Sequence, residues 1–310
     1  MVAAAELQLG FFGGDPDNFT YPRYALDFAF LRVYGSDGNP LETDHYFNWS
    51  LDGVEEEDVV FVIGNPGPTN RLNTVAQLEF QRDVSVAAQK SFLESRLAIM
   101  KAFYEAHPEE GEAMGLRNQM FSLSNSLKAN SGRLEALKDP VIMTRKADGE
   151  SQFQTALNND PELNTRWGDL IQRISRIQDE KETLGPEYSA YVRLRPGNTE
   201  SSLLVRALFA AQYLAAREAG APANQLSQME TRIAGVSAQP PEMEEAFLAE
   251  RLRDFERFLG RDHPVTEAAL DGRSVEGATH HLLTQSALRS PESTARAMED
   301  GTLSAQDPAI

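Results

Sequence analysis

One carboxylate near the start of the chain has the surroundings of a residue that does chemistry. Asp27 follows an irregular loop and opens a stretch, residues 28–34, in which the side chains alternate between two sides. In that alternation Asp27 falls on the apolar side, with Ala29, Leu31 and Val33. A carboxylate in apolar surroundings is costly unless a specific partner meets it. Two interpretations follow: Asp27 ties down the loop, or it orients the histidine of a Ser-His-Asp triad.

The sequence of the loop before Asp27 permits backbone conformations that most residues cannot adopt. Gly13 and Gly14 permit angles and close approaches that a Cβ would forbid, and the Asp and Asn residues that follow can bond to nearby amides. Together with the strand it resembles the signature of a bacterial family of serine exopeptidases, the dipeptidyl-peptidases 7 and 11. The matching residues are Gly13-Gly14-Asp15, Asp17-Asn18, Pro22-Arg23, Asp27-Phe28 and Arg32-Val33-Tyr34. The departures are Pro16 for Thr, Phe19 for Trp, and Tyr24-Ala25-Leu26 for His-Thr-Gly.

The resemblance implies a chymotrypsin-like double β-barrel with a large helical domain inserted. It makes Asp27 the acid of the triad, and it assigns Asn18 and Phe19 to the substrate's free amino terminus. The family's histidine lies upstream of the glycine loop and its serine lies in a downstream Gly-Asn-Ser-Gly segment, whereas this chain has no Gly-x-Ser-Gly. We therefore expect an internal fragment with one triad member of three, and negligible hydrolysis by the chain alone.

The amino-acid composition argues against polyanionic binding partners. The chain has 310 residues, a formal net charge of −18 and a pI of about 4.7, which argue against nucleic acid or an anionic membrane. It has no cysteine, hence no disulfide and no thiol nucleophile, and no apolar run long enough to cross a membrane. The first six residues lack the basic start and apolar core of a signal peptide, so we expect none here, and no metal or organic cofactor is implied.

The periodicity of apolar residues predicts an α+β, mostly α fold. Alternation predicts strands at 7–11 and 27–34, followed by a turn at 35–38 and a stretch around 46–49, and a final strand is predicted at 59–63. These strands are too few to close a barrel. We assign residues 1–72 to the C-terminal part of the first barrel lobe, which carries the Asp27 loop. Residues 73–310 become the inserted helical domain, incomplete at its C-terminal end. The Gly-rich segment 64–71 lacks a P-loop ending and is interpreted as the hinge.

From Thr74 the apolar spacing becomes helical. Thr74 and Gln77 can form a capping box, and His107-Pro108 ends the first helix. Apolar stripes then predict helices around 116–127, 163–174, 204–215 and 248–259, with shorter ones at 274–285 and 291–299. The helix at 204–215 is expected to be capped near Asn198-Thr199 and stopped by Gly220, and the helix at 248–259 to be stopped by Gly260.

One predicted helix has a second stripe opposite its apolar one. Its members are small, polar and uncharged: Asn118, Ser122, Asn125, Ala129 and Gly132. The stripe could pack against another helix, or it could form a wall of a peptide cleft. The segment 121–128 also resembles the family's helical signature, in which an Asn reaches the substrate's amino terminus. That likeness assigns the role to Asn125, with Asn130 as the alternative.

The five histidines do not form a metal motif, and each is better placed on a surface or in a core than in a triad. By resemblance, the intact protein releases dipeptides from peptides with a free amino terminus, in the periplasm or at the cell surface of a Gram-negative bacterium. The likeness allows a homodimer of the intact protein. The alternative from another class is a non-catalytic, acidic helical module that binds proteins, in which Asp27 ties a loop and the 118–132 stripe packs against a helix.

Overall fold

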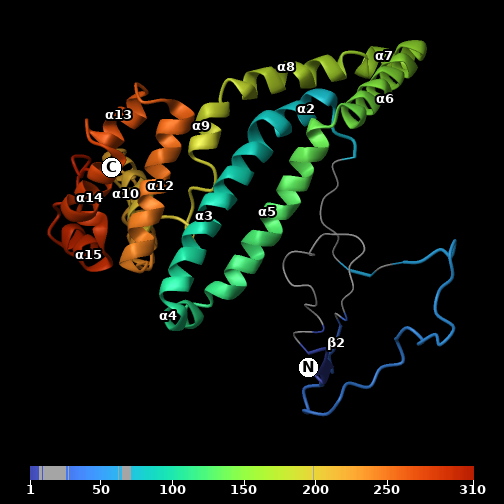
Figure 1. Ribbon diagram of the computed structural model, residues 1–310, viewed down its shortest axis with the longest axis horizontal. Helices are drawn as coiled ribbons and strands as arrows, with labels where there is room; N and C mark the ends of the chain where they lie inside the picture. Colours follow the sequence, from blue (N-terminus) through green and yellow to red (C-terminus); the bar gives the residue numbers. More distant parts are fainter. Residues whose placement is uncertain (7–8, 10–25, 27, 62, 65–70, 198) are drawn as a thin grey trace. The chain divides into compact units, whose positions relative to one another are not determined.

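The structure, a computed structural model, describes residues 1–6, 9, 26, 28–61, 63–64, 71–197 and 199–310 (Figure 1). The chain divides into two compact units, Met1–Asn73 and Thr74–Ile310. The described helices are in the second unit, apart from a single helical residue at Leu9, and the described sheet is in the first. The prediction of an α+β, mostly helical fold is confirmed.

The first unit contains a small antiparallel sheet. Strand β1 (Ala3–Ala4) pairs with β2 (Ala29–Phe30) in a register that sets Ala3 opposite Phe30. The turn expected at residues 35–38 is present, since the Gly38 amide donates to the Gly35 carbonyl at 3.1 Å and Gly38 takes a φ of 78°. Glycine is needed there because a side chain would strain a positive φ.

Most of the expected strand structure is not found in this unit. The strand predicted at 59–63 is wrong for its described residues, and the one predicted at 27–34 is reduced to β2 and a bridge at Tyr34. The predicted strand at 7–11 and Asp27 lie outside the described residues, except for Leu9. Leu31 and Val33 are 76% and 65% exposed, so the side expected to be covered is open. A strand persists only where a neighbour takes its hydrogen bonds and a layer covers its face.

The second unit begins with one long helical rod. It consists of α2 (Val75–Phe80), a π-helical turn η2 (Gln81–Ser85) and α3 (Val86–Ala106). The predicted capping box is confirmed, with Thr74 and Gln77 bonded reciprocally at the start of α2. The predicted end is confirmed too, because His107 is the C-terminal cap of α3. The π turn was not predicted; a single wide turn leaves no clear mark on apolar spacing.

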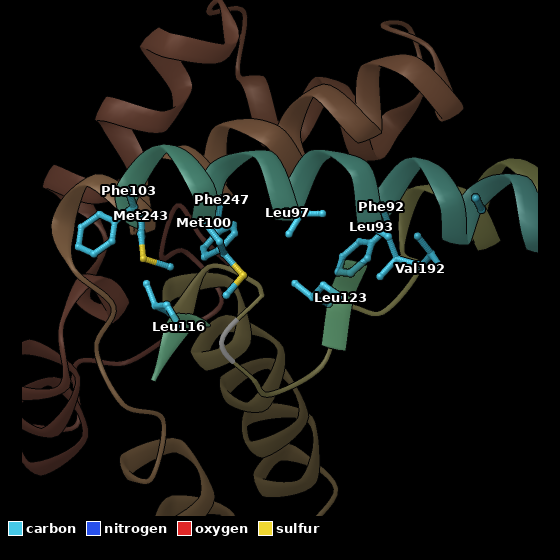
Figure 2. Close-up of a cluster of buried hydrophobic side chains, with 11 residues drawn as sticks. Phe92, Leu93, Leu97, Met100, Phe103, Leu116, Leu123, Val192, Met243 and Phe247 are labelled. Atoms are coloured by element: carbon cyan, nitrogen blue, oxygen red, sulfur yellow. The ribbon is translucent and has the colours of Figure 1, made fainter. Parts of the chain in front are cut away.

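The rod folds back on itself to make a hairpin. After α4 (Pro108–Ala113), helix α5 (Leu116–Lys138) packs against α3 along its length (Figure 1). Figure 2 shows the apolar side chains that fill the space between α3, α5 and neighbouring segments. Phe92, Leu93 and Met100 of α3 are buried there with Leu116 and Leu123 of α5. The apolar stripes therefore face each other, as their spacing predicts.

Beyond the hairpin the chain turns through shorter helices. The single helix predicted over 163–174 is wrong, because Gly168-Asp169 interrupts it between α7 and α8. The side chain of Asp160 caps α7 by accepting two backbone N–H bonds. Helix α8 runs back alongside α2. These elements are α6 (Pro140–Asn159), α7 (Pro161–Trp167), α8 (Leu170–Glu182) and α9 (Gly185–Ala190).

The remaining helices pack as a separate group around two apolar clusters. They are α10 (Ser202–Glu218), α11 (Ala223–Ala234), α12 (Pro241–Leu259), α13 (Pro264–Leu270), α14 (Val275–Gln285), η3 (Ala287–Arg289) and α15 (Pro291–Glu299). The ends predicted at Gly260, Gln285 and Glu299 are confirmed. The cap predicted near Asn198-Thr199 is wrong. Ser201 caps α10, because its hydroxyl accepts from the Leu204 amide at 3.2 Å.

A cluster of four buried charges joins the hairpin to this group. Arg96 on α3, Glu200 before α10, and Arg251 and Asp254 on α12 are each at most 2% exposed. Arg96 donates to Asp254 at 3.0 Å, Arg251 donates to Glu200, and the two arginines lie against the Phe92 ring. Arg251 also donates to the carbonyl of Val192 at 3.0 Å. Buried charges are tolerated only when paired and hydrogen-bonded, so the cluster fixes how these segments meet.

Arg96→Met should lower the free energy of unfolding by about 3–5 kcal/mol, because buried Asp254 loses the guanidinium that hydrogen-bonds to it and keeps only the longer ion pairs with Arg251 and Arg257. Arg253→Met is the matched control, since Arg253 pairs with Glu276 at 3.1 Å on the exposed side of α12 and should cost less than about 1 kcal/mol. Urea unfolding followed by far-UV circular dichroism measures both. The double variant Arg96→Met, Asp254→Leu should cost less than the sum of its single changes. Equal costs for the two arginine variants would contradict a paired, desolvated cluster.

Candidate functional site

The outer face of α5 carries the uncharged stripe that the sequence singled out. Asn118, Ser122, Ala129 and Gly132 are exposed, and Asn125 is half-buried. A Cβ built on Gly132 meets no atom of the described residues within 4 Å. The stripe lies opposite the buried leucines that pack on α3, and no described helix covers it. The alternative of helix–helix packing is therefore not what the described part of the chain shows.

The two asparagines considered for substrate binding differ in their surroundings. Asn130 donates its side-chain amide to the carbonyl of Ser126, one turn back on the same helix, at 2.8 Å. That bond uses the side chain locally and holds it along α5. Asn125 belongs to the uncharged stripe and projects from the opposite side of the helix from Asn130. The assignment to Asn125 stays a prediction, and it carries the proposal below.

The other predicted site residues cannot be placed beside Asn125. Asp27, Asn18 and Phe19 lie outside the described residues. Of the stretch that follows them, Phe28 and Phe30 make an edge-on ring contact with centroids 5.4 Å apart. Their predicted roles therefore rest on the sequence signature.

Two of the histidines have structural partners. His107 lies against the Phe103 ring, and its Nε2 is 2.8 Å from Glu242 Oε2. His263 caps α13, with its Nδ1 accepting from the Val265 amide at 3.3 Å. His45 and His280 are exposed and His281 is half-buried. Among the described residues, no histidine is bonded to a serine in the manner of a catalytic base.

The described ranges contain neither a metal-binding cluster nor a membrane-spanning helix. No group of three His, Asp or Glu side chains in them could hold a metal ion. None of their helices combines the length and the apolar character needed to span a bilayer.

Comparison with known proteins identifies the family. The family model of peptidase S46 matches residues 1–310, so the chain belongs to the peptidase S46 family. This confirms the family resemblance drawn from residues 13–34, since the named relatives are dipeptidyl-peptidases.

Two curated relatives illustrate the likeness. The chain is 33% identical over 174 residues to an Asp/Glu-specific dipeptidyl-peptidase of Shewanella putrefaciens, which covers 53% of this chain and 24% of the relative. It is 30% identical over 179 residues to dipeptidyl-peptidase 7 of Capnocytophaga gingivalis, covering 54% of this chain and 24% of that protein. The aligned part of the chain thus spans about a quarter of the length of these relatives.

A solved structure supports the fold. The crystal structure of DPP11 of Porphyromonas endodontalis superposes with a TM-score of 0.63 and 20% sequence identity. The match covers 97% of this chain and 45% of that one. At this identity the likeness establishes the fold and does not transfer a substrate.

Gly132→Ala should raise the free energy of unfolding by about 0.5–1 kcal/mol, because a glycine inside an exposed helix costs entropy and the new methyl group meets open space. Gly149→Ala on α6 is the matched control, since Gly149 is also exposed within a helix and also has open space around its Cβ. Urea unfolding of the 310-residue chain measures both changes. A loss of stability for Gly132→Ala alone would mean that another backbone packs on this face.

Proposed function

We propose that this chain is part of a serine-type dipeptidyl-peptidase, which releases dipeptides from the free amino terminus of peptides. The observation that carries the proposal is the family match over residues 1–310, together with the signature at residues 13–34. The named relatives are dipeptidyl-peptidases, which supports the same reaction class for the protein to which this chain contributes.

In this proposal Asp27 is a positioning residue. It accepts a hydrogen bond from the histidine base, holds the imidazole in the productive tautomer and stabilises the imidazolium that forms. The histidine and the serine nucleophile are proposed to come from other polypeptide, since this sequence has no Gly-x-Ser-Gly and none of its described histidines is bonded to a serine. The chain by itself is therefore proposed to be inactive as a hydrolase. A histidine, a serine and an oxyanion hole supplied by other polypeptide would complete the site.

The amino terminus of the substrate sets where the cut falls. An ammonium group that leaves water needs acceptors that converge on it. The side-chain oxygens of Asn18 and Asn125 are proposed to accept these bonds, with Phe19 packing beside the first residue. Fixing the amine in this way holds the scissile bond at one distance from the nucleophile.

The helical unit is proposed to close the cleft. The outer face of α5 bears small uncharged side chains, so a peptide backbone can approach it closely. Helices hold such a wall more rigidly than loops do. A closed cleft would exclude longer chains and limit the enzyme to the ends of peptides. We propose a periplasmic or cell-surface location for the intact protein, in keeping with the family resemblance.

Asp27→Asn in the complete enzyme that carries this chain should lower kcat by about 10⁴-fold while folding is preserved, because the imidazole loses its orienting acceptor. The measurement is the hydrolysis of a fluorogenic dipeptide substrate, with a circular dichroism melt to check the fold. Asp37→Asn is the control, since Asp37 bonds within its own turn to Asn39 and should leave kcat unchanged. Unchanged turnover in Asp27→Asn would remove Asp27 from the triad and favour the binding-module alternative.

Asn125→Ala should reduce kcat/KM for peptides by about 10- to 100-fold, because a hydrogen bond to the charged amine is lost. Asn118→Ala makes the same chemical change two turns away on the same face of α5 and should leave kcat/KM nearly unchanged. Steady-state kinetics on a dipeptide substrate compares the two. With a peptide whose amino terminus is acetylated, the two variants should have the same kcat/KM, because the charged amine is absent. Equal losses for Asn118→Ala and Asn125→Ala would contradict a specific role for Asn125.

A further inference from the structure

A pocket of about 470 Å³ lies between α10, the end of α11 and the loop that joins α11 to α12. Val205 and Phe209 of α10 and Val236 of the loop give it apolar walls. Ser202 closes one side by donating its hydroxyl to the Ser237 carbonyl at 2.8 Å. The volume falls within the range of roughly 300–1,000 Å³ that is typical of small-molecule sites.

The pocket has one charged wall residue, Arg232, and the described residues that line it include no acid. The Arg232 guanidinium carbon lies 4.4 Å from the centre of the Phe209 ring. Stacking on an aromatic face holds a guanidinium while leaving its N–H edge open to a planar anion. Within the described part of the chain, no ion pair involves Arg232.

A second positive charge stands behind the same wall. Arg206 is 1% exposed and donates to three carbonyls, those of Leu288, Val236 and Arg289. Burial lowers the pKa of Arg206, and the charges of Glu244 and Glu292 oppose that shift. Arginine remains protonated in proteins, so the guanidinium contributes a full charge beside the Val236 wall.

Two acids on the neighbouring helices are already engaged. Glu244 accepts from the Ser202 amide at 2.8 Å and the Leu203 amide at 2.9 Å, so its charge is directed at the start of α10. Glu230, half a turn from Arg232 on α11, accepts from the Tyr213 hydroxyl at 3.0 Å. The pocket therefore combines apolar walls with an available guanidinium.

We propose that this pocket binds a small carboxylate with an apolar body. The carboxylate would take a bidentate bond from Arg232, and the apolar part would lie against Val205, Phe209 and Val236. A peptide carboxyl terminus and a non-peptide carboxylic acid share this chemistry. The proposal does not depend on the peptidase activity or on the α5 face.

Saturation-transfer NMR titrations of the 310-residue chain test it with three probes: N-acetyl-valyl-leucine, its carboxyl-terminal amide, and 3-phenylpropionate. The acetylated dipeptide acid should bind at least about tenfold more tightly than the amide, because only the acid pairs with Arg232. Comparable binding of 3-phenylpropionate would assign the site to carboxylates in general, and weaker binding would assign it to peptide ends. No saturation of either acid below about 10 mM would overturn the proposal.

Arg232→Gln should weaken binding of the preferred acid by about tenfold or more. Arg217→Gln is the matched control, because Arg217 also stacks on an aromatic ring, that of Tyr213, but does not line the pocket. It should change the affinity by less than about twofold. A circular dichroism melt confirms that both variants fold. Equal weakening by the two variants, or none in Arg232→Gln, would overturn the proposal.

Discussion

The helical unit depends on a set of charges that water does not reach. Arg96, Glu200, Arg251 and Asp254 come from three separate segments, and each loses its hydration when those segments meet. Burial raises the pKa of Asp254, while the positive charges of Arg96 and Arg251 oppose that rise. Burying these charges costs little net free energy when they are paired, and several kcal/mol when one is left unpaired. A packing that separated them would therefore be strongly destabilised. The cluster therefore selects one way of joining α3 to α12.

The buried charge cluster also determines, through the α3–α5 hairpin, how the outer face of α5 is presented. Helix α3 is tied to α12 at Arg96, and it packs on α5 through Phe92, Leu93 and Met100. The apolar face of α5 is thereby turned inward, and its uncharged face is turned out. A face carried on packed helices keeps its side chains at fixed spacing, which suits the positioning of one substrate group.

Local signals in the sequence predicted local structure well. The cap at Thr74, the stop at Gly260, the end of α14 at Gln285 and the bounds of α15 follow from neighbouring residues, and the structure has them. The buried charges could not be predicted in this way. Arg96 and Asp254 are 158 residues apart, and on helical spacing alone each looks like an ordinary surface charge. The strand predictions were wrong for a related reason. A strand is stabilised by hydrogen bonds to a partner that can lie far away in the sequence, and among the described residues no layer covers the predicted strands. Asp27, Asn18, Phe19 and Asn125 are predicted from family signatures in the sequence, and their roles stay predictions.

The distribution of charge over the chain determines which anions the pocket lined by Arg232 can bind. Acids outnumber basic residues 47 to 29 in the chain, yet the buried charges of the described residues are three arginines and three acids. The negative excess is therefore carried by the surface, where salt screens it over roughly 8 Å at physiological ionic strength. At long range, an anion that approaches Arg232 experiences the screened repulsion of the acidic surface. Only at contact does it experience the attraction of the guanidinium stacked on Phe209. Such a balance disfavours large polyanions, which would span acidic surface, and favours a single carboxylate small enough to enter.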